Sequence, residues 1–112
     1  MELVVEEGPA GVTRAALIGR MDIEGAQTVE TPFRVLTRLR RALVVDLSRV
    51  SFMASMGLRT LMIGARAQSE LGGKLVLANP QPNVEKVLKE SGIGEIIGVY
   101  PSVEAAAAAL SA

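Results

Sequence analysis

The chain has 112 residues, with twelve basic and twelve acidic side chains and a formal net charge of zero. This length suits one domain that buries a core without disulfides. The chain has no cysteine, which excludes thiol chemistry, and no histidine, which is the commonest general base and metal ligand. A balanced charge with two phenylalanines, one tyrosine and no tryptophan argues against nucleic-acid binding.

Two strands joined by a tight turn are predicted first. Residues 3–7, LVVEE, and 12–19, VTRAALIG, are apolar and β-branched, and GPAG between them supplies turn residues. We expect an antiparallel hairpin. The opening residues lack the regions of a signal peptide, and no apolar run approaches the ~20 residues of a membrane span. We therefore expect a cytoplasmic protein without membrane insertion.

A helix is predicted after the second strand, with Asp22 as its N-cap. Pro32 would remove a hydrogen bond and clash one turn back inside a helix. We therefore expect the helix to break and restart, with Thr31 as cap and Pro32 as the first residue after the break. Its apolar stripe is expected to hold Phe33, Val35, Leu36 and Leu39, and its solvated face Arg34, Arg38, Arg40 and Arg41.

Two apolar segments, 42–47 (ALVVDL) and 74–78 (KLVLA), show little alternation, which is typical of strands covered on both faces. The stretch between them has the clearest helical period of the chain. Its apolar positions are Leu58, Leu61, Met62 and Ala65. Gly72 and Gly73 are expected to end this helix.

The last third of the chain predicts a helix over 82–90 that ends at Gly92, a short strand over 95–99, and a terminal helix capped by Ser102. Two strands followed by alternating helices and strands predict an α/β fold with an at least partly parallel sheet. We expect residues 1–112 to form a single domain.

Sites for cofactors and metals are not indicated. GGK at 72–74 lacks the spacing of a phosphate loop and precedes a strand, and GxGxxG does not occur. Asp46 ends a buried strand, where we expect it to bond local backbone. We therefore expect no cofactor and no metal.

Ser55, within FMASMGLRTL, lies where an extended segment gives way to a helix. A serine elbow needs glycine two positions earlier, where Met53 stands, and no histidine can deprotonate the hydroxyl, so we expect no catalytic residue and no enzyme. Two interpretations stay open. The serine caps the helix, or it accepts a phosphate, because helix N-termini favour negative charge. Phe52 and Met53 are expected in the core. Of the three, Met56 is the candidate for exposure, where it would be a contact for a protein partner, and burial of both methionines is the alternative that stays open.

Three segments, LIGRMD, VVDLSRVSFMASMGLRTLM and GGKLVLANPQPNVEKVLKESGIGEII, resemble STAS domains, specifically the bacterial anti-sigma factor antagonists. The resemblance runs from about residue 12 to the end and is most specific over 43–62. It implies a STAS-like α/β fold, a four- to five-stranded mixed sheet with about four helices packed against it.

The resemblance also implies a partner switch that regulates sigma-factor-dependent transcription. The unphosphorylated antagonist binds an anti-sigma factor that is also a serine kinase, and this frees the sigma factor. Phosphorylation by the kinase separates the complex, and a serine phosphatase restores the antagonist.

The family's loop pattern, Asp-Ser-[Ser/Thr]-Gly-Leu, matches the residues from Ala54 to Leu58. The acceptor serine is kept as Ser55, whereas alanine replaces the acid and methionine the second hydroxyl. Asp22 matches the family's Gly-x-[Leu/Ile]-Asp motif. The resemblance thus implies phosphorylation at Ser55 and a partner-binding surface of Asp22, Ala54, Ser55, Met56, Gly57 and Arg59.

An alternative is that the chain is a constitutive STAS subunit of a stress-signalling scaffold or of a lipid-transport ABC complex. The altered loop, without the acid and with Met56, keeps this possibility open. Nucleotide binding, which is reported within the family, has no phosphate loop to support it here.

Overall fold

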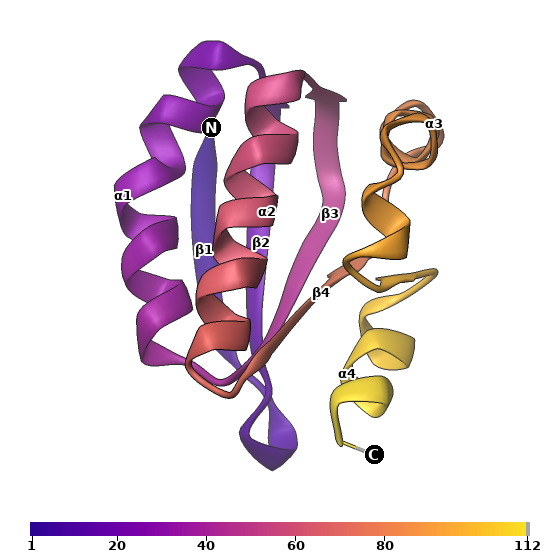
Figure 1. Ribbon diagram of the computed structural model, residues 1–112. Coiled ribbons are helices and arrows are strands. Elements are labelled where there is room, and N and C mark those ends of the chain that lie inside the picture. The colour runs from indigo at the N-terminus through magenta and orange to yellow at the C-terminus, as the bar shows by residue number, and fades with distance from the viewer. Residues whose placement is uncertain (112) are drawn as a thin grey trace.

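The computed structural model describes residues 1–111 and shows a five-stranded mixed sheet with four α-helices packed on it (Figure 1). The elements in chain order are β1 (Glu2–Glu7), β2 (Thr13–Met21), α1 (Ile23–Leu39), β3 (Ala42–Met53), α2 (Ser55–Glu70), β4 (Lys74–Ala78), α3 (Pro82–Ser91), β5 (Val99–Tyr100) and α4 (Val103–Ser111). The strand order is β1-β2-β3-β4-β5, with β1 antiparallel to β2 and every later pair parallel. The predicted fold class is confirmed.

The first two strands form the expected hairpin. Leu3 stands opposite Leu17, so apolar side chains of both strands share one face of the sheet. A short 3-10 turn, Pro9–Gly11, connects them, and Gly11 takes a φ of 77°, which suits a residue without a side chain.

The parallel pair β2 and β3 brings two strand ends to the same edge of the sheet. Their register runs from Thr13 opposite Leu43 to Met21 opposite Met53. β3 has twelve residues and continues well beyond the predicted 42–47 segment. This extension decides where α2 begins.

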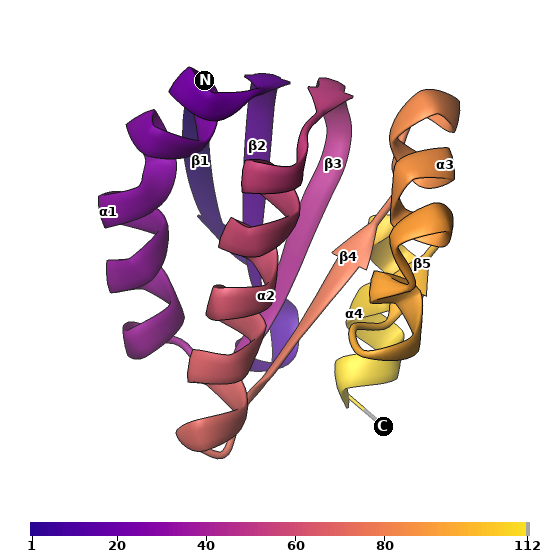
Figure 2. The ribbon, with the colours of Figure 1, turned by 45° about the horizontal axis from the view of Figure 1, so that its top comes forward.

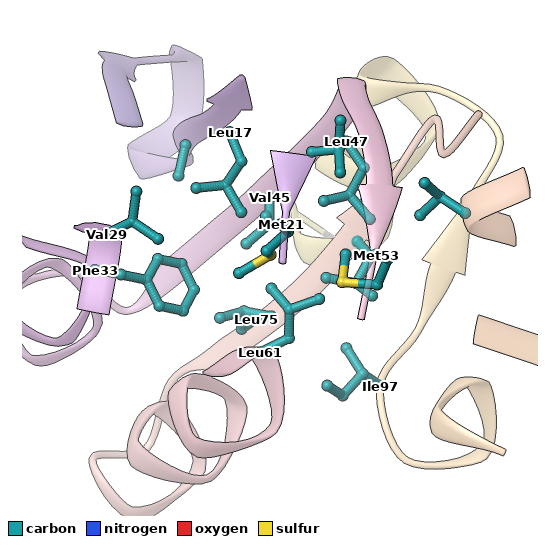
Figure 3. Close-up of a cluster of buried hydrophobic side chains, with 14 of the residues drawn as sticks. Leu17, Met21, Val29, Phe33, Val45, Leu47, Met53, Leu61, Leu75 and Ile97 are labelled. Carbon is teal, nitrogen blue, oxygen red and sulfur yellow. The ribbon is translucent and has the colours of Figure 1, made fainter. Parts of the chain in front are cut away.

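The larger core lies on the face of the sheet that α1, α2 and α3 cover. Figure 3 shows Leu17, Phe33 and Leu61, from β2, α1 and α2, pointing toward one another within it. Val84 and Leu88 of α3 belong to the same cluster. A smaller cluster on the opposite face joins the sheet to α4, which lies behind β4 in Figure 2.

α1 corrects the predicted break at Thr31 and Pro32. It runs unbroken through Pro32, whose side chain is exposed. The buried positions Ala26, Val29, Phe33 and Leu36 continue one stripe across the proline. Packing of this stripe holds the helix together. Thr28, whose carbonyl loses its donor at residue 32, is an exposed residue.

The expected stripe of that helix is also corrected. Phe33 and Leu36 are buried, but Val35 and Leu39 are exposed. A helical repeat of 3.6 residues carries positions 35 and 39 to the outer face once 29, 33 and 36 face the sheet.

Two further predictions are wrong. Phe52 is 37% exposed although Met53 is 3% exposed, because neighbouring residues of a strand point to opposite faces. Of the segment predicted as a strand over 95–99, Glu95 ends a 3-10 turn, Ile93–Glu95, residues 96–98 are irregular, and Val99 begins the two-residue strand β5. Ile93 and Ile97, four residues apart, are buried and Ile96 is exposed, a spacing typical of a helical turn.

The helices α2 and α4 agree with the sequence. Leu61 is fully buried, with Leu58, Met62 and Ala65 packed partly against the same core. Ser102 caps α4, accepting a hydrogen bond from the Ala105 amide at 3.0 Å. In the described residues 1–111, no helix has the length and apolar character needed to cross a membrane.

Candidate functional site

The ends of β2 and β3 place the starts of α1 and α2 side by side. Met21 and Met53 are the last paired residues of the two strands, and the Ala54 amide donates to the Met21 carbonyl at 3.0 Å. Asp22 follows one strand and Ala54 the other, so both helices begin at one edge of the sheet (Figure 1). The parallel register therefore brings Asp22 and the start of α2 to the same edge of the sheet, as the family resemblance implies.

Asp22 caps α1, which confirms that prediction. Its Oδ1 accepts a hydrogen bond from the Gly25 amide at 2.8 Å. This bond lowers the pKa of Asp22, and the positive charge of Arg20 lowers it further; the Arg20 Nε lies 3.5 Å from the Asp22 Oδ2. The carboxylate is therefore ionised at neutral pH.

The start of α2 corrects the capping interpretation of Ser55. Ala54 occupies the N-cap position and Ser55 is the first helical residue, so the serine hydroxyl makes no cap hydrogen bond. The first turn of α2 contains no acidic residue. By contrast, α1 is capped by Asp22, α3 carries Glu85 in its first turn, and α4 is capped by Ser102.

An uncapped helix start attracts anions. The amides of Ser55 and Met56 precede the first intrahelical donors, Gly57 and Leu58, which bond to the Ala54 carbonyl at 2.9 and 3.2 Å. Such free amides and the helix dipole together favour negative charge. The Ser55 side chain is exposed at this position.

The other predicted residues differ in accessibility. Arg59 is exposed, Met56 is 38% exposed and Ala54 is half-buried. Gly57 is buried: a β-carbon there would lie 2.5 Å from the Met53 Sδ and 2.8 Å from the Met21 Cγ. Gly57 thus lets α2 approach the strand ends, and it offers no surface of its own.

Exposed apolar and aromatic groups also lie at this edge of the sheet. Ile23 is 59% exposed in the first turn of α1, and Phe52 lies at the end of β3. The Arg20 guanidinium stacks over the Phe52 ring, 4.5 Å from its centroid. The sequence does not indicate Arg20 as part of the site, and it predicts Phe52 in the core. Alternation along β3 would have revealed Phe52 had the strand been extended to Met53.

Within residues 1–111, no side chain bonds to the Ser55 hydroxyl, and no three acidic side chains gather as a metal site would require. Asp46, the other candidate, lies on the far side of the sheet. It accepts from the Ser48 amide at 3.0 Å, as predicted, and also from Arg14 at 2.6 Å.

A family comparison and a comparison with known proteins both find sequences similar to this chain. The profile of the STAS domain matches residues 5–106. The chain is 34% identical over 100 residues to BtrV of Bordetella bronchiseptica, named as a candidate anti-sigma factor antagonist; the match covers 88% of this chain and 86% of BtrV.

Solved structures share the fold. A candidate anti-sigma factor antagonist from Thermotoga maritima superposes with a TM-score of 0.90 at 20% identity, covering 98% of this chain and 95% of the other. SpoIIAA, a Bacillus cell fate determinant in its phosphorylated form, superposes with a TM-score of 0.67 at 21% identity, covering 88% and 90%.

Proposed function

Because this chain belongs to the STAS domain family, among its anti-sigma factor antagonists, we propose that it binds an anti-sigma factor serine kinase through the surface around Ser55 and is released by phosphorylation of that serine. The observation that carries the proposal is the exposed Ser55 hydroxyl on the first turn of α2, which has neither a capping side chain nor an acid.

The surroundings of Ser55 suit a protein contact. Ile23, Phe52 and Met56 expose apolar area at the same edge of the sheet, and Arg20 is stacked on the Phe52 ring. Aromatic, methionine and arginine side chains are enriched in protein interfaces. Asp22 adds one fixed, half-buried carboxylate beside them, which would pair with a cation of the partner.

A phosphate on Ser55 would act as the switch. It adds roughly −1.5 to −2 charges in the middle of this surface. Burying that charge against a partner without a matching cation costs several kcal/mol, and every 1.4 kcal/mol is tenfold in affinity. Release then needs no rearrangement of the antagonist. A serine phosphatase would return the chain to its binding form.

The residues flanking Ser55 affect its phosphorylation by the kinase more than they affect partner binding. Ala54 stands where the family pattern has an acid, so this chain lacks a charge that could orient the kinase or its metal ion. Met56, in place of a second hydroxyl, adds exposed apolar area. We expect partner binding to tolerate both departures better than the phosphorylation rate does.

The test uses the purified anti-sigma factor kinase of the same organism. Incubation with ATP should add one phosphate to the wild-type chain, read by intact mass, and none to Ser55→Ala. Without ATP, Ser55→Asp should weaken binding at least tenfold in calorimetry. Ser69→Asp, an exposed serine near the other end of α2, is the matched control and should bind like wild type.

The contrary outcome is equally clear. If Ser55→Asp binds the kinase as tightly as wild type and Ser55 stays unmodified, the switch is absent. A constitutive STAS subunit would then be the better description of the chain.

A further inference from the structure

A groove between α1 and α2 opens next to Ser55. It has a volume of about 380 Å³. We define the α1–α2 groove by the residues that shape it, Phe33, Arg34 and Arg38 on α1 and Met56, Arg59 and Ile63 on α2. Met56 and Arg59 lie one and four residues after Ser55, so the groove continues the proposed partner-binding surface along the two helices.

The groove has an apolar floor set by a close helix contact. A β-carbon on Gly64 would lie 2.6 Å from the Phe33 Cε2, so the absence of a side chain there lets the ring lie against α2. Phe33 is buried, whereas Met56 and Ile63 rise along the α2 side at 38% and 53% exposure. Apolar area this exposed on one helix is available for a further contact.

The rim of the groove is positively charged. Arg34 and Arg38 lie one helical turn apart on α1. Arg59 lines the same groove from α2. Among the described residues, no ion pair within 4.0 Å involves any of these three guanidinium groups. Glu30 is the one acidic residue that lines the groove. The rim is therefore complementary to an acidic partner.

The length of the groove favours a helical occupant over a small ligand. Its lining runs from Ala26 to Arg38 on α1 and from Met56 to Ala67 on α2. At 1.5 Å per residue this is roughly 17 Å, or about three helical turns. A helix that lies in a groove uses apolar anchors spaced over this distance, with charged residues at its sides.

We propose that the α1–α2 groove binds an acidic amphipathic helix of the anti-sigma factor, with its apolar face on Phe33, Met56 and Ile63 and its carboxylates on the three arginines. The proposal rests on the proposed function and names a second contact region beyond Ser55. This region adds affinity and selects partners that carry such a helix.

The experiment compares two variants of equal charge. Arg34→Glu/Arg38→Glu reverses the α1 rim, and Arg49→Glu/Arg66→Glu reverses two exposed arginines that do not line the groove. Binding to the same purified kinase is measured by calorimetry without ATP, after circular dichroism has shown that both variants are folded. The groove variant should bind at least tenfold more weakly than wild type and lose less of its affinity at high salt, since exposed charges are screened. The control variant should stay within about threefold.

Three results would overturn the proposal. If the groove variant binds like the control while Ser55→Asp is impaired, the proposed function stands and the groove has no part in it. If the wild-type chain itself does not bind the kinase, both proposals fail. If dodecyl phosphate binds wild type at micromolar concentration and the groove variant keeps its kinase affinity, the groove is a site for a small anionic amphiphile.

Discussion

The Arg14 guanidinium and the Asp46 carboxylate form an ion pair across the two central parallel strands, with the Arg14 Nη2 2.6 Å and the Nε 3.1 Å from the Asp46 Oδ2. Asp46 is buried beneath it and also accepts from the Ser48 amide. Burial raises the pKa of Asp46, but the bonds from Ser48 and Arg14 outweigh this, so its pKa lies below the usual value.

The first prediction concerns how the stability that this ion pair contributes changes at acid pH. A lowered pKa means that the stabilisation is complete above the unfolded-state value of about 4 and is lost as the pH falls through the folded-state value. Asp46→Asn keeps the shape and removes the charge. We expect it to lower the free energy of unfolding at pH 7 by about 1–2 kcal/mol, since Arg14 is partly exposed and its attraction is screened.

Urea unfolding followed by circular dichroism at pH 7 and pH 3 checks this. The difference between wild type and Asp46→Asn should shrink toward pH 3. Glu6→Gln, which removes an exposed partner of the same arginine, serves as control and should change stability by less than about 0.5 kcal/mol. A difference that stays constant across the pH range would contradict the account.

The second prediction concerns Gly57 and the position of α2. A β-carbon at this residue would enter the space of Met21 and Met53, both of which are buried. Gly57→Ala should therefore push the first turn of α2 away from the strand ends and destabilise the chain by about 1–3 kcal/mol. Chemical denaturation measures the change.

The control for Gly57→Ala is Gly94→Ala, where the nearest heavy atom is 4.0 Å from the added carbon. It should cost less than about 0.5 kcal/mol. If both variants lose the same free energy of unfolding, the close approach at Gly57 is not the cause of the destabilisation.

Much of the fold follows from the sequence because its elements differ in period. The apolar runs at 42–47 and 74–78 and the helical spacing from Leu58 to Ala65 indicate buried strands around a helix, and these are present. Strand length was harder to predict, because residues 48–53 contain polar side chains. Pairing with β2 over its full length extends β3 to Met53, and this tertiary contact is invisible in a single segment.

The candidate site could be predicted only in part, because its residues come together through the pairing of strands that are distant in the sequence. The family resemblance implied that Asp22 and Ser55 belong to one surface, and the parallel strands β2 and β3 end at the same edge of the sheet, where both residues follow. The exact start of α2 was missed by one residue, which moved the cap from Ser55 to Ala54. Arg20 and Phe52 pair across strands, and this register became visible in the folded chain.

The third prediction concerns Pro32, which interrupts the hydrogen bonds of α1 without ending the helix. Pro32→Ala restores an amide that can donate to the Thr28 carbonyl. We expect the free energy of unfolding to rise by about 1 kcal/mol, since the recovered helix bond outweighs the greater freedom of the unfolded chain. Thermal unfolding checks this, with Gln27→Ala, an exposed position of the same helix, as control. An unchanged or lowered midpoint would mean that the proline is already well accommodated.

The fourth prediction concerns the missing acid at Ala54. Ala54→Asp should cap α2 and raise the free energy of unfolding by about 1 kcal/mol, because its carboxylate would accept from the free amides of the first turn. Ala54→Asn caps without adding charge, so the difference between the two variants measures the attraction of this helix end for an anion, expected to be about 0.3–1 kcal/mol.

A double-mutant cycle then shows whether position 54 and Ser55 use the same amides. Ser55→Asp alone should stabilise α2 slightly, because it also places a negative charge at the helix start. In the Ala54→Asp background this gain should disappear or become a loss, since the amides are occupied and the two carboxylates repel each other. Additive effects would mean that a charge on Ser55 does not interact with the start of α2. The same cycle with Ser69→Asp, far from both residues in the chain, should be additive.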